Sequence, residues 1–216
     1  MRKRLAPARP LKRPYRPRER RKRFLILCEG AVTEKTYFLD LRSLIRSPLV
    51  EVEIAPEHGR DPKSLVELAK VRRERAEVEA KRQRDENILY NEVWCVFDVD
   101  DHIRLRDALQ QARDCSISVA VSNPCFELWI LLHFATQWAY IDRHSLRVAI
   151  RQHLPGYDKK VDFAALRDRG NSAIQRAREM EQRAARDGDL YSNPTTGVWR
   201  LVCELCRQSH YSAEKL

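Results

Sequence analysis

The stretch Phe24-Leu-Ile-Leu-Cys-Glu-Gly30 decides the fold class, because five consecutive apolar residues precede an acid and a glycine. A short apolar run of this kind is typical of a strand that is buried on both faces of a parallel sheet. Residues 93–97 have the same character and also precede an acid, Asp98. Two further strands are predicted over 50–55 and 116–121, so the chain carries four predicted strands.

Helical patterns separate these strands. Thr33 and Asn123 are the predicted N-caps of two helices, and Pro62 and Pro124 suit the first helical position, where no N–H donor is needed. The helices expected between the strands and after the fourth one cover 33–45, 62–85, 103–113 and 123–134. Strands that alternate with helices predict a parallel, doubly wound α/β sheet, in which ligands bind beyond the carboxyl ends of the strands.

The length of 216 residues allows one large α/β domain with a helical extension. From residue 142 onward the pattern is helical, with helices predicted over 142–153, 161–167, 170–186 and 198–209. We therefore divide the chain into a basic tail (1–22), an α/β core (23–140) and a helical C-terminal part packed on the core (141–216).

The net charge of +10 comes from the first residues of the chain. Residues 1–23 hold 12 Lys or Arg and one acid, so 29 basic and 30 acidic residues remain in 24–216. Prolines exclude one regular helix here, which favours a disordered basic arm that neutralises phosphates. The predicted nucleic-acid contacts of this arm are Arg16, Arg18, Arg20, Arg21 and Lys22. The alternative is that the arm only keeps the terminus soluble.

Several classes of protein are excluded or disfavoured. The longest apolar stretch, 126–134, contains Glu127 and His133 and is far shorter than the roughly 20 residues of a membrane span. There is no apolar signal region, and the CxxC of Cys203 and Cys206 lacks the second pair of a zinc site. We therefore expect a cytoplasmic protein with unpaired cysteines. No Walker sequence is present, so the chain supplies no ATPase site of its own.

Acidic residues follow the first and third predicted strands. Glu29 ends the first, and Asp98, Asp100 and Asp101 end the third. Side chains alternate along a strand, so Asp98 and Asp100 point the same way and Asp101 points elsewhere. Converging carboxylates repel one another unless they hold a hard cation, and Mg²⁺ or Mn²⁺ bound with water and a phosphate oxygen fits this arrangement. The alternative is that such acids cap the next helix, which is the favoured interpretation for Asp101.

Longer motifs resemble a known family. A Glu-Gly after an apolar strand and a later DxD look like the Toprim domain of primases, topoisomerases and OLD-family nucleases. The motifs Leu27-Cys-Glu-Gly-Ala-Val-Thr-Glu-Lys-Thr-Tyr37, Val96-Phe-Asp-Val-Asp-Asp-His102, Ser122-Asn-Pro-Cys-Phe-Glu-Leu-Trp129 and Asn193-Pro-Thr-Thr-Gly-Val198 are similar to the RloB family. This Toprim-related bacterial family is linked to restriction and abortive-infection loci, often beside an AAA-type ATPase. The resemblance covers about residues 22–206.

The resemblance implies a set of site residues. Glu29 matches the Toprim glutamate, and Asp98 and Asp100 match its two metal-binding aspartates. Glu34 matches the second acid of the EGxxTE pattern, and Glu127 matches the acid of the SNPxFELW segment. These five acids are the predicted catalytic residues, with Mg²⁺ or Mn²⁺ held by the first three. The implied fold is a Toprim-like parallel sheet with flanking helices.

Other residues have open interpretations. Glu127 lies in the first turn of a helix, where a carboxylate also stabilises the helix dipole. Arg60, in the loop after the second strand, is a predicted phosphate ligand. Lys159 and Lys160 could supply positive charge to a cleaved phosphodiester, although a solvated loop is the favoured interpretation. His133, on an apolar helix, is expected to be a buried core residue.

These observations predict a metal-dependent nuclease that cuts DNA or RNA in a bacterial anti-phage or abortive-infection system, together with an ATPase partner. The alternative is a non-catalytic module that binds nucleic acid or an ATPase and holds a structural metal. In that case the charged helix 70–86 could be a docking surface. The sequence leaves open which nucleic acid is cut, whether one or two metals bind, and whether the chain forms a homo-oligomer.

Overall fold

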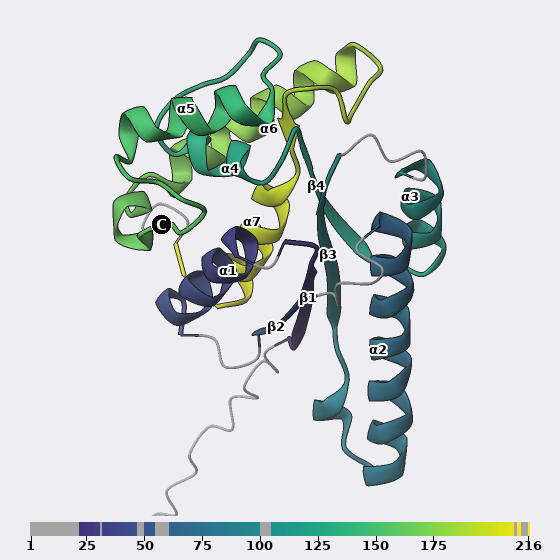
Figure 1. Cartoon of the computed structure of the whole chain (residues 1–216). Helices are drawn as coiled ribbons and strands as arrows, with labels where there is room; N and C mark the ends of the chain where they lie inside the picture. Colours follow the sequence, from purple (N-terminus) through teal and green to yellow (C-terminus); the bar gives the residue numbers. More distant parts are fainter. Residues whose placement is uncertain are drawn as a thin grey trace, which may run out of the picture.

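The computed structural model describes residues 22–30, 32–46, 50–54, 61–99, 105–209, 211, 212 and 216 (Figure 1). Several predicted functional residues lie outside this set, namely Arg16, Arg18, Arg20, Arg21, Arg60, Asp100 and Asp101. The basic tail predicted over 1–22 is described only at Lys22. The roles assigned to these residues therefore stay predictions.

A five-stranded sheet in the order β2-β1-β3-β4-β5 forms the centre of the described structure. Its strands are β1 (Phe24–Cys28), β2 (Val50–Ile54), β3 (Glu92–Asp98), β4 (Ser118–Asn123) and β5 (Thr195–Thr196). The first four run parallel, and β5 pairs antiparallel with β4. The parallel α/β sheet predicted from the sequence is confirmed.

Helices cover both faces of the sheet. They are α1 (Thr33–Leu44), α2 (Pro62–Gln83), α3 (Leu105–Asp114), α4 (Glu127–Leu132), α5 (Arg143–His153), α6 (Gly170–Arg186) and α7 (Val198–Gln208), with the short 3₁₀ turns η1 (Glu86–Ile88) and η2 (Phe163–Leu166). In Figure 1, α2 and α3 lie on one side of the sheet, and α1, α7 and the group α4–α6 lie on the other. The predicted helical C-terminal extension is therefore present.

Alternation along β1 explains how one strand serves both faces. Phe24, Ile26 and Cys28 belong to the larger apolar core, which includes side chains of α1, α4, α5, α6 and α7. Leu25 and Leu27 belong to the smaller core with α2 and α3. All five side chains are fully or almost fully buried. The uninterrupted apolar run is thus a strand that is buried on both faces, as the sequence indicates.

Two predicted N-caps are wrong. Thr33 is the first residue of α1 rather than its cap, and its hydroxyl donates a hydrogen bond to the Lys159 carbonyl (3.0 Å). Asn123 ends β4, and its side-chain amide donates to the Tyr191 carbonyl (2.7 Å) instead of capping a helix. In both cases the side chain bonds to a segment that is distant in the sequence, which local pattern does not reveal.

The helix predicted over 123–134 is shorter than expected. α4 begins at Glu127, so Pro124 precedes the helix and does not occupy its first position. The carboxylate of Asp98, at the end of β3, accepts the backbone N–H of Phe126 (2.9 Å). The Asp98 carboxylate of β3 therefore accepts the backbone N–H that a local N-cap side chain would otherwise accept at the start of α4.

The C-terminal part adds two features that the sequence pattern does not predict. Strand β5 pairs with the end of β4, where the buried hydroxyls of Ser122 and Thr196 lie 2.9 Å apart. The helix predicted over 161–167 is instead the 3₁₀ turn η2. A strand of two residues is too short to show alternation, so only its pairing reveals it. This pairing ties the helical part to the core sheet.

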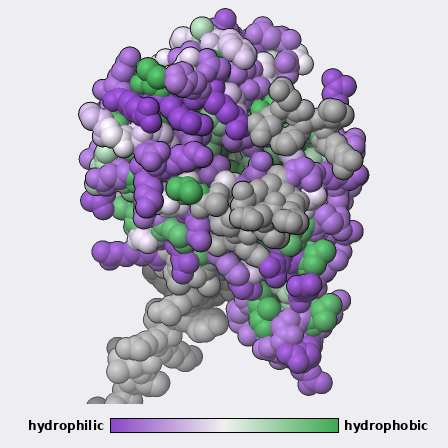
Figure 2. Space-filling view, in the orientation of Figure 1, coloured by the Kyte–Doolittle hydropathy of each residue, from purple (hydrophilic) through white to green (hydrophobic). Residues whose placement is uncertain are grey.

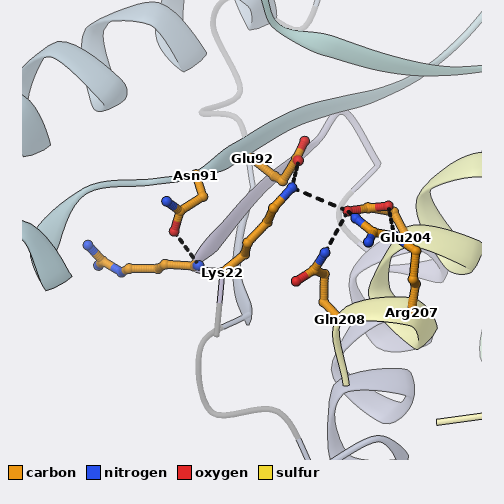
Figure 3. Close-up of polar contacts among 7 residues, drawn as sticks. Lys22, Asn91, Glu92, Glu204, Arg207 and Gln208 are labelled. Carbon is orange, nitrogen blue, oxygen red and sulfur yellow. Dashed lines mark hydrogen bonds and ion pairs between the residues drawn. The ribbon is translucent and has the colours of Figure 1, made fainter. Parts of the chain in front are cut away.

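A polar cluster closes the amino-terminal end of the sheet (Figure 3). The Lys22 ammonium forms ion pairs with Glu92 of β3 (2.7 Å) and Glu204 of α7 (3.6 Å). Glu204 also accepts hydrogen bonds from Arg207 and Gln208. The hydrogen bond to Glu92 raises the pKa of Lys22. The phosphate contact predicted for Lys22 stays a prediction, and two carboxylates would compete with the phosphate for this charge.

The core position expected for His133 is confirmed. His133 is 3 % exposed, and its Nδ1 lies 2.9 Å from the Trp129 carbonyl oxygen. All six cysteines are unpaired, and the CxxC pair lies on α7, with Cys206 buried and Cys203 partly buried. Burial lowers the pKa of His133 to about 4, so this imidazole is neutral near pH 7.

In the described part of the chain, no helix is both long and apolar enough to cross a bilayer. The face of the molecule drawn in Figure 2 is mostly hydrophilic, with small and separate hydrophobic areas. Val78 on α2 is one of the exposed apolar side chains. Scattered exposed apolar residues of this kind are normal for a protein surface.

Candidate active site

The strands β1 and β3 lie side by side, and the chain leaves them in opposite directions. β1 connects through α1 to β2, whereas β3 connects through α3 to β4 on the other side of the pair. Such a switch point is where parallel α/β sheets bind their ligands. Glu29 follows β1 at this point, and its carboxylate accepts the backbone N–H of Asp98 at the end of β3 (3.3 Å). Two of the three predicted metal ligands, Glu29 and Asp98, are therefore adjacent.

A cavity of about 390 Å³ opens at this switch point. The carboxylates that line it are Glu29, Glu34, Asp98 and Glu127. The cations that line it are Arg143, Arg147 and Lys159. The structure thus brings together four of the five acids predicted as catalytic, and the fifth, Asp100, lies outside the described residues.

Asp98 is held through both carboxylate oxygens. Oδ1 accepts the Phe126 N–H (2.9 Å), and Oδ2 lies 3.4 Å from Nη2 of Arg143 at the start of α5. The Asp98 side chain is only 16 % exposed. Burial raises the pKa of Asp98 well above its ordinary value, the Glu34 carboxylate raises it further, and Arg143 opposes the rise. Asp98 is therefore a buried acid whose charged form would be favoured by a further cation.

Glu34 is buried in the first turn of α1 and lies against Gly30. A Cβ atom at position 30 would come within 2.0 Å of Glu34 Oε2, so glycine is the residue that leaves room for this carboxylate. Burial raises the pKa of Glu34 to about 7, and the carboxylates of Glu127 and Glu29 contribute to the rise. The glycine of the Glu29-Gly30 motif therefore has a steric role, because it leaves room for the Glu34 carboxylate, and Glu29 supplies a charge.

Glu127 is the first residue of α4 and is 8 % exposed. The next two residues, Leu128 and Trp129, are fully buried in the larger core. This packing fixes the start of α4 against the sheet. The structure accordingly places Glu127 in the same cavity as Glu29 and Asp98.

Two arginines that line the cavity were not predicted as site residues from the sequence. Arg143 and Arg147 lie one turn apart on α5. The available signal was their i, i+4 spacing at the start of the helix predicted over 142–153, which places both on one helix face. The sequence does not show which other element that face meets. Their place at the site is decided by the packing of α5 beside α4.

Lys159 lines the cavity, although the sequence favours a solvated loop for it. The residue itself is exposed, and its backbone is left-handed, with φ at 59°. The Thr33 hydroxyl at the start of α1 holds the Lys159 carbonyl at 3.0 Å. A hydrogen bond to the acidic side of the cavity therefore positions this loop.

The donor chemistry of the cavity fits a hard divalent cation. Burial and neighbouring carboxylates raise the pKa values of Glu34 and Asp98. A bound divalent cation would lower both pKa values, because it favours the charged carboxylates. Within the described residues, no group of three or more His, Cys, Asp or Glu side chains is arranged to hold a metal ion. A cation held by Glu29 and Asp98 would therefore need a further ligand. Asp100 is the candidate that the family resemblance supplies.

The comparison with known proteins gives one match. The family model described as RloB-like protein matches residues 24–205. No curated protein and no solved structure matches the chain. The family match spans most of the sequence and includes all four acids of the cavity. The chain therefore belongs to the RloB family of RloB-like proteins.

Proposed function

We propose that this protein is a metal-dependent nuclease, which hydrolyses phosphodiester bonds of DNA or RNA. The observation that supports it is the cavity at the switch point, which is lined by both carboxylates and cations. Carboxylates are the ligands that Mg²⁺ and Mn²⁺ prefer, and Arg and Lys bind phosphate. The excess of basic residues in 1–23 suits a polyanion and favours nucleic acid over a small phosphate ester.

The acids of the cavity would divide the chemistry between them. Glu29 and Asp98, with Asp100, would hold Mg²⁺ or Mn²⁺. When bound, the cation supplies Lewis-acid activation of the phosphate and of an attacking water. Glu34, whose pKa is about 7 in the metal-free protein, can accept or release a proton near neutral pH. Glu127 would provide a further ligand or orient water, and Glu29 is the alternative base if a single cation binds.

Arg143 supports this site through Asp98. Its positive charge opposes the rise in the Asp98 pKa and so favours the carboxylate that a cation needs. The same guanidinium donates to the Pro124 carbonyl (3.3 Å), which lies between β4 and α4. Arg143 thereby joins β3, α5 and the segment before α4 at the edge of the cavity.

The wider role follows from the family resemblance. We infer that the protein acts in bacterial defence against phage, by abortive infection or restriction, together with an AAA-type ATPase. These 216 residues contain no Walker sequence, so they do not supply the ATPase site. Phage plating on cells that express both chains, compared with cells in which this chain carries Asp98→Asn, tests this role.

The direct test of the proposed function is Asp98→Asn. The matched control is Asp107→Asn, because Asp107 is exposed on α3, on the other face of the sheet. Plasmid DNA and transfer RNA are incubated with each variant and Mg²⁺ or Mn²⁺. Asp98→Asn should lower the cleavage rate by at least about a hundredfold, and the control should cleave as the wild type does.

Two further measurements separate a nuclease from a non-catalytic module. Calorimetry should show weaker Mg²⁺ binding by Asp98→Asn than by the wild type. The melting temperature of the metal-free variant should not fall, because the amide keeps an acceptor for Phe126 and removes a buried charge. Tight Mg²⁺ binding by a wild type that cleaves neither nucleic acid would instead support the non-catalytic module.

A further inference from the structure

We propose that Arg147 and Lys159 form the subsite of this cavity that binds a phosphate of the nucleic-acid chain, whereas Arg143 is committed to Asp98. The inference rests on the proposed function, since it assigns the substrate contacts of the same site. It concerns the cationic side of the cavity, which the acids and their metal chemistry leave unexplained.

The three arginines of α5 have different partners. Arg143, Arg147 and Arg151 are spaced i, i+4 and i+8 and therefore lie along one side of the helix. The guanidinium of Arg143 contacts the Asp98 carboxylate (3.4 Å), and Nε of Arg151 donates to the Tyr157 carbonyl (3.1 Å). Nε of Arg147 is buried and has no hydrogen-bond partner in the described part of the protein. The middle arginine of the row is thus the one with an unused donor at the cavity.

An unused buried donor needs an acceptor. Leaving a buried N–H unpaired costs stability. Several buried side-chain atoms of the described residues have no partner, and Nε of Arg147 is the one whose residue lines this cavity. A phosphate oxygen would accept from Nε of Arg147, and the planar guanidinium can hold two oxygens of one phosphate at once. Because Arg147 lines the cavity, a phosphate that enters the cavity would meet this side chain.

The backbone of Lys159 supports the same assignment. A left-handed conformation is unfavourable for a lysine, and such strain persists only where the surroundings enforce it. The Thr33 hydroxyl donates to the carbonyl of this residue (3.0 Å), and Thr33 directly precedes Glu34 of the acidic side. The buried Tyr157, two residues earlier, anchors the loop to the core. The loop thus places an exposed ammonium beside the carboxylates at a cost in stability.

Neutralising the acids does not account for these two cations. Lys159 lowers the pKa of Glu34 only through space, and in the described part of the chain neither Lys159 nor Arg147 forms an ion pair with a carboxylate of the cavity. Arg143 is the cation that pairs with one of these acids. Arg147 and Lys159 therefore keep charge available for an anion that enters the cavity.

The test uses the full chain and a short, fluorescein-labelled single-stranded oligonucleotide as the probe. A short probe has few phosphates, which limits the contribution of the basic residues before Phe24. Affinity is measured in Ca²⁺ and in chelator for Arg147→Gln, Arg147→Lys and Lys159→Asn. The matched control is Arg113→Gln, since Arg113 is exposed on α3, on the other face of the sheet. Asparagine is chosen at position 159 because it tolerates a left-handed backbone.

We expect Arg147→Gln and Lys159→Asn each to weaken binding by about tenfold, and the control to bind as the wild type does. The slope of log affinity against log salt should fall by about 0.7 for each phosphate of the single strand that the variant no longer neutralises. Arg147→Lys should bind the probe more tightly than Arg147→Gln and less tightly than the wild type. Lysine keeps the positive charge but lacks the planar guanidinium that holds two phosphate oxygens. Inorganic phosphate should compete with the probe less effectively in Arg147→Gln than in the wild type.

Several results would overturn the inference. Binding by Arg147→Gln and Lys159→Asn that equals the control would show that the cations of the subsite do not touch phosphate. If Arg147→Gln melts at a much lower temperature, Arg147→Lys and Lys159→Asn decide the question instead. Failure of the nuclease proposal looks different, because the wild type would then bind the probe and cleave no nucleic acid. Weaker binding by the variants would still support the phosphate subsite in that case.

Discussion

The two sides of the cavity are built from different parts of the fold. Its carboxylates come from the ends of β1 and β3 and from the first turns of α1 and α4. Its cations come from α5 and from the loop that follows α5. The acids are also the more deeply placed. The Asp98 side chain is 16 % exposed and that of its partner Arg143 is 41 % exposed, and Glu34 and Glu127 are buried whereas Lys159 is exposed.

This difference separates two tasks. Buried carboxylates that repel one another gain most from a small cation, which reaches deep positions. Cations nearer to solvent are better placed to meet a polymer, whose backbone cannot enter the protein interior. The acidic side is therefore expected to control turnover and the stability of the metal-free protein, and the cationic side to control substrate affinity.

The largest effect expected on the acidic side, beyond that of Asp98, is on turnover in Glu127→Gln. If Glu127 binds a cation or water, the variant should lose about a hundredfold in cleavage rate, with little change in melting temperature. If Glu127 only complements the dipole of α4, the variant should lose about 0.3–1 kcal/mol of stability and keep its rate. Cleavage assays and thermal unfolding on the same samples distinguish the two. A wild-type rate would remove Glu127 from the active site.

A smaller effect is expected from Gly30→Ala. The added methyl group must displace the Glu34 carboxylate, so turnover should fall by about tenfold while oligonucleotide binding changes little. The matched control is Gly197→Ala, where the nearest atom to the new Cβ would be 3.4 Å away. A larger loss of binding than of turnover in Gly30→Ala would contradict the division of tasks between the two sides.

A separate prediction concerns stability rather than turnover, namely the pH dependence of unfolding. Because the pKa of Glu34 is raised to about 7, the folded metal-free protein binds this proton more tightly than the unfolded chain does. The stabilisation is present below about pH 4.5 and is lost as the pH rises to about 7, at a total of about 3 kcal/mol. Denaturant unfolding in chelator should show this decline, and Glu34→Gln should reduce it. Exposed Glu74 provides the control, Glu74→Gln, which should leave the decline unchanged.

Much of the acidic side could be predicted from the sequence. Glu29 and Asp98 each follow a run of apolar residues. A strand that is buried on both faces is apolar at every position, so such a run can be recognised from composition alone. Parallel strands then bring their carboxyl ends to one edge, which the pairing of β1 with β3 bears out. Glu34 and Glu127 are predicted through their match to motifs of the family that the sequence resembles. Local sequence and one rule of topology therefore predict the positions of Glu29 and Asp98, and the resemblance adds the other two acids.

The cationic side could not be predicted in the same way. Arg143 and Arg147 look like ordinary charged residues of a surface helix, since i, i+4 spacing fixes a face and not its neighbour. Lys159 looks like a loop residue, and its carbonyl accepts a hydrogen bond from Thr33, which is 126 positions away. No pattern of neighbouring residues encodes a contact of that range.

The sequence by itself determined the four parallel strands, the order in which helices follow them, and the acids at the ends of the first and third strands, because each depends on a pattern over a few residues. The tertiary structure alone decided three further features. Asp98 accepts a backbone N–H at the start of α4, β5 joins the sheet, and arginines of α5 line the cavity with the acids. The physical reason is the same in all three cases. A polar group is satisfied, or a charge is balanced, by whichever partner packing brings near, and packing is settled by the whole apolar core.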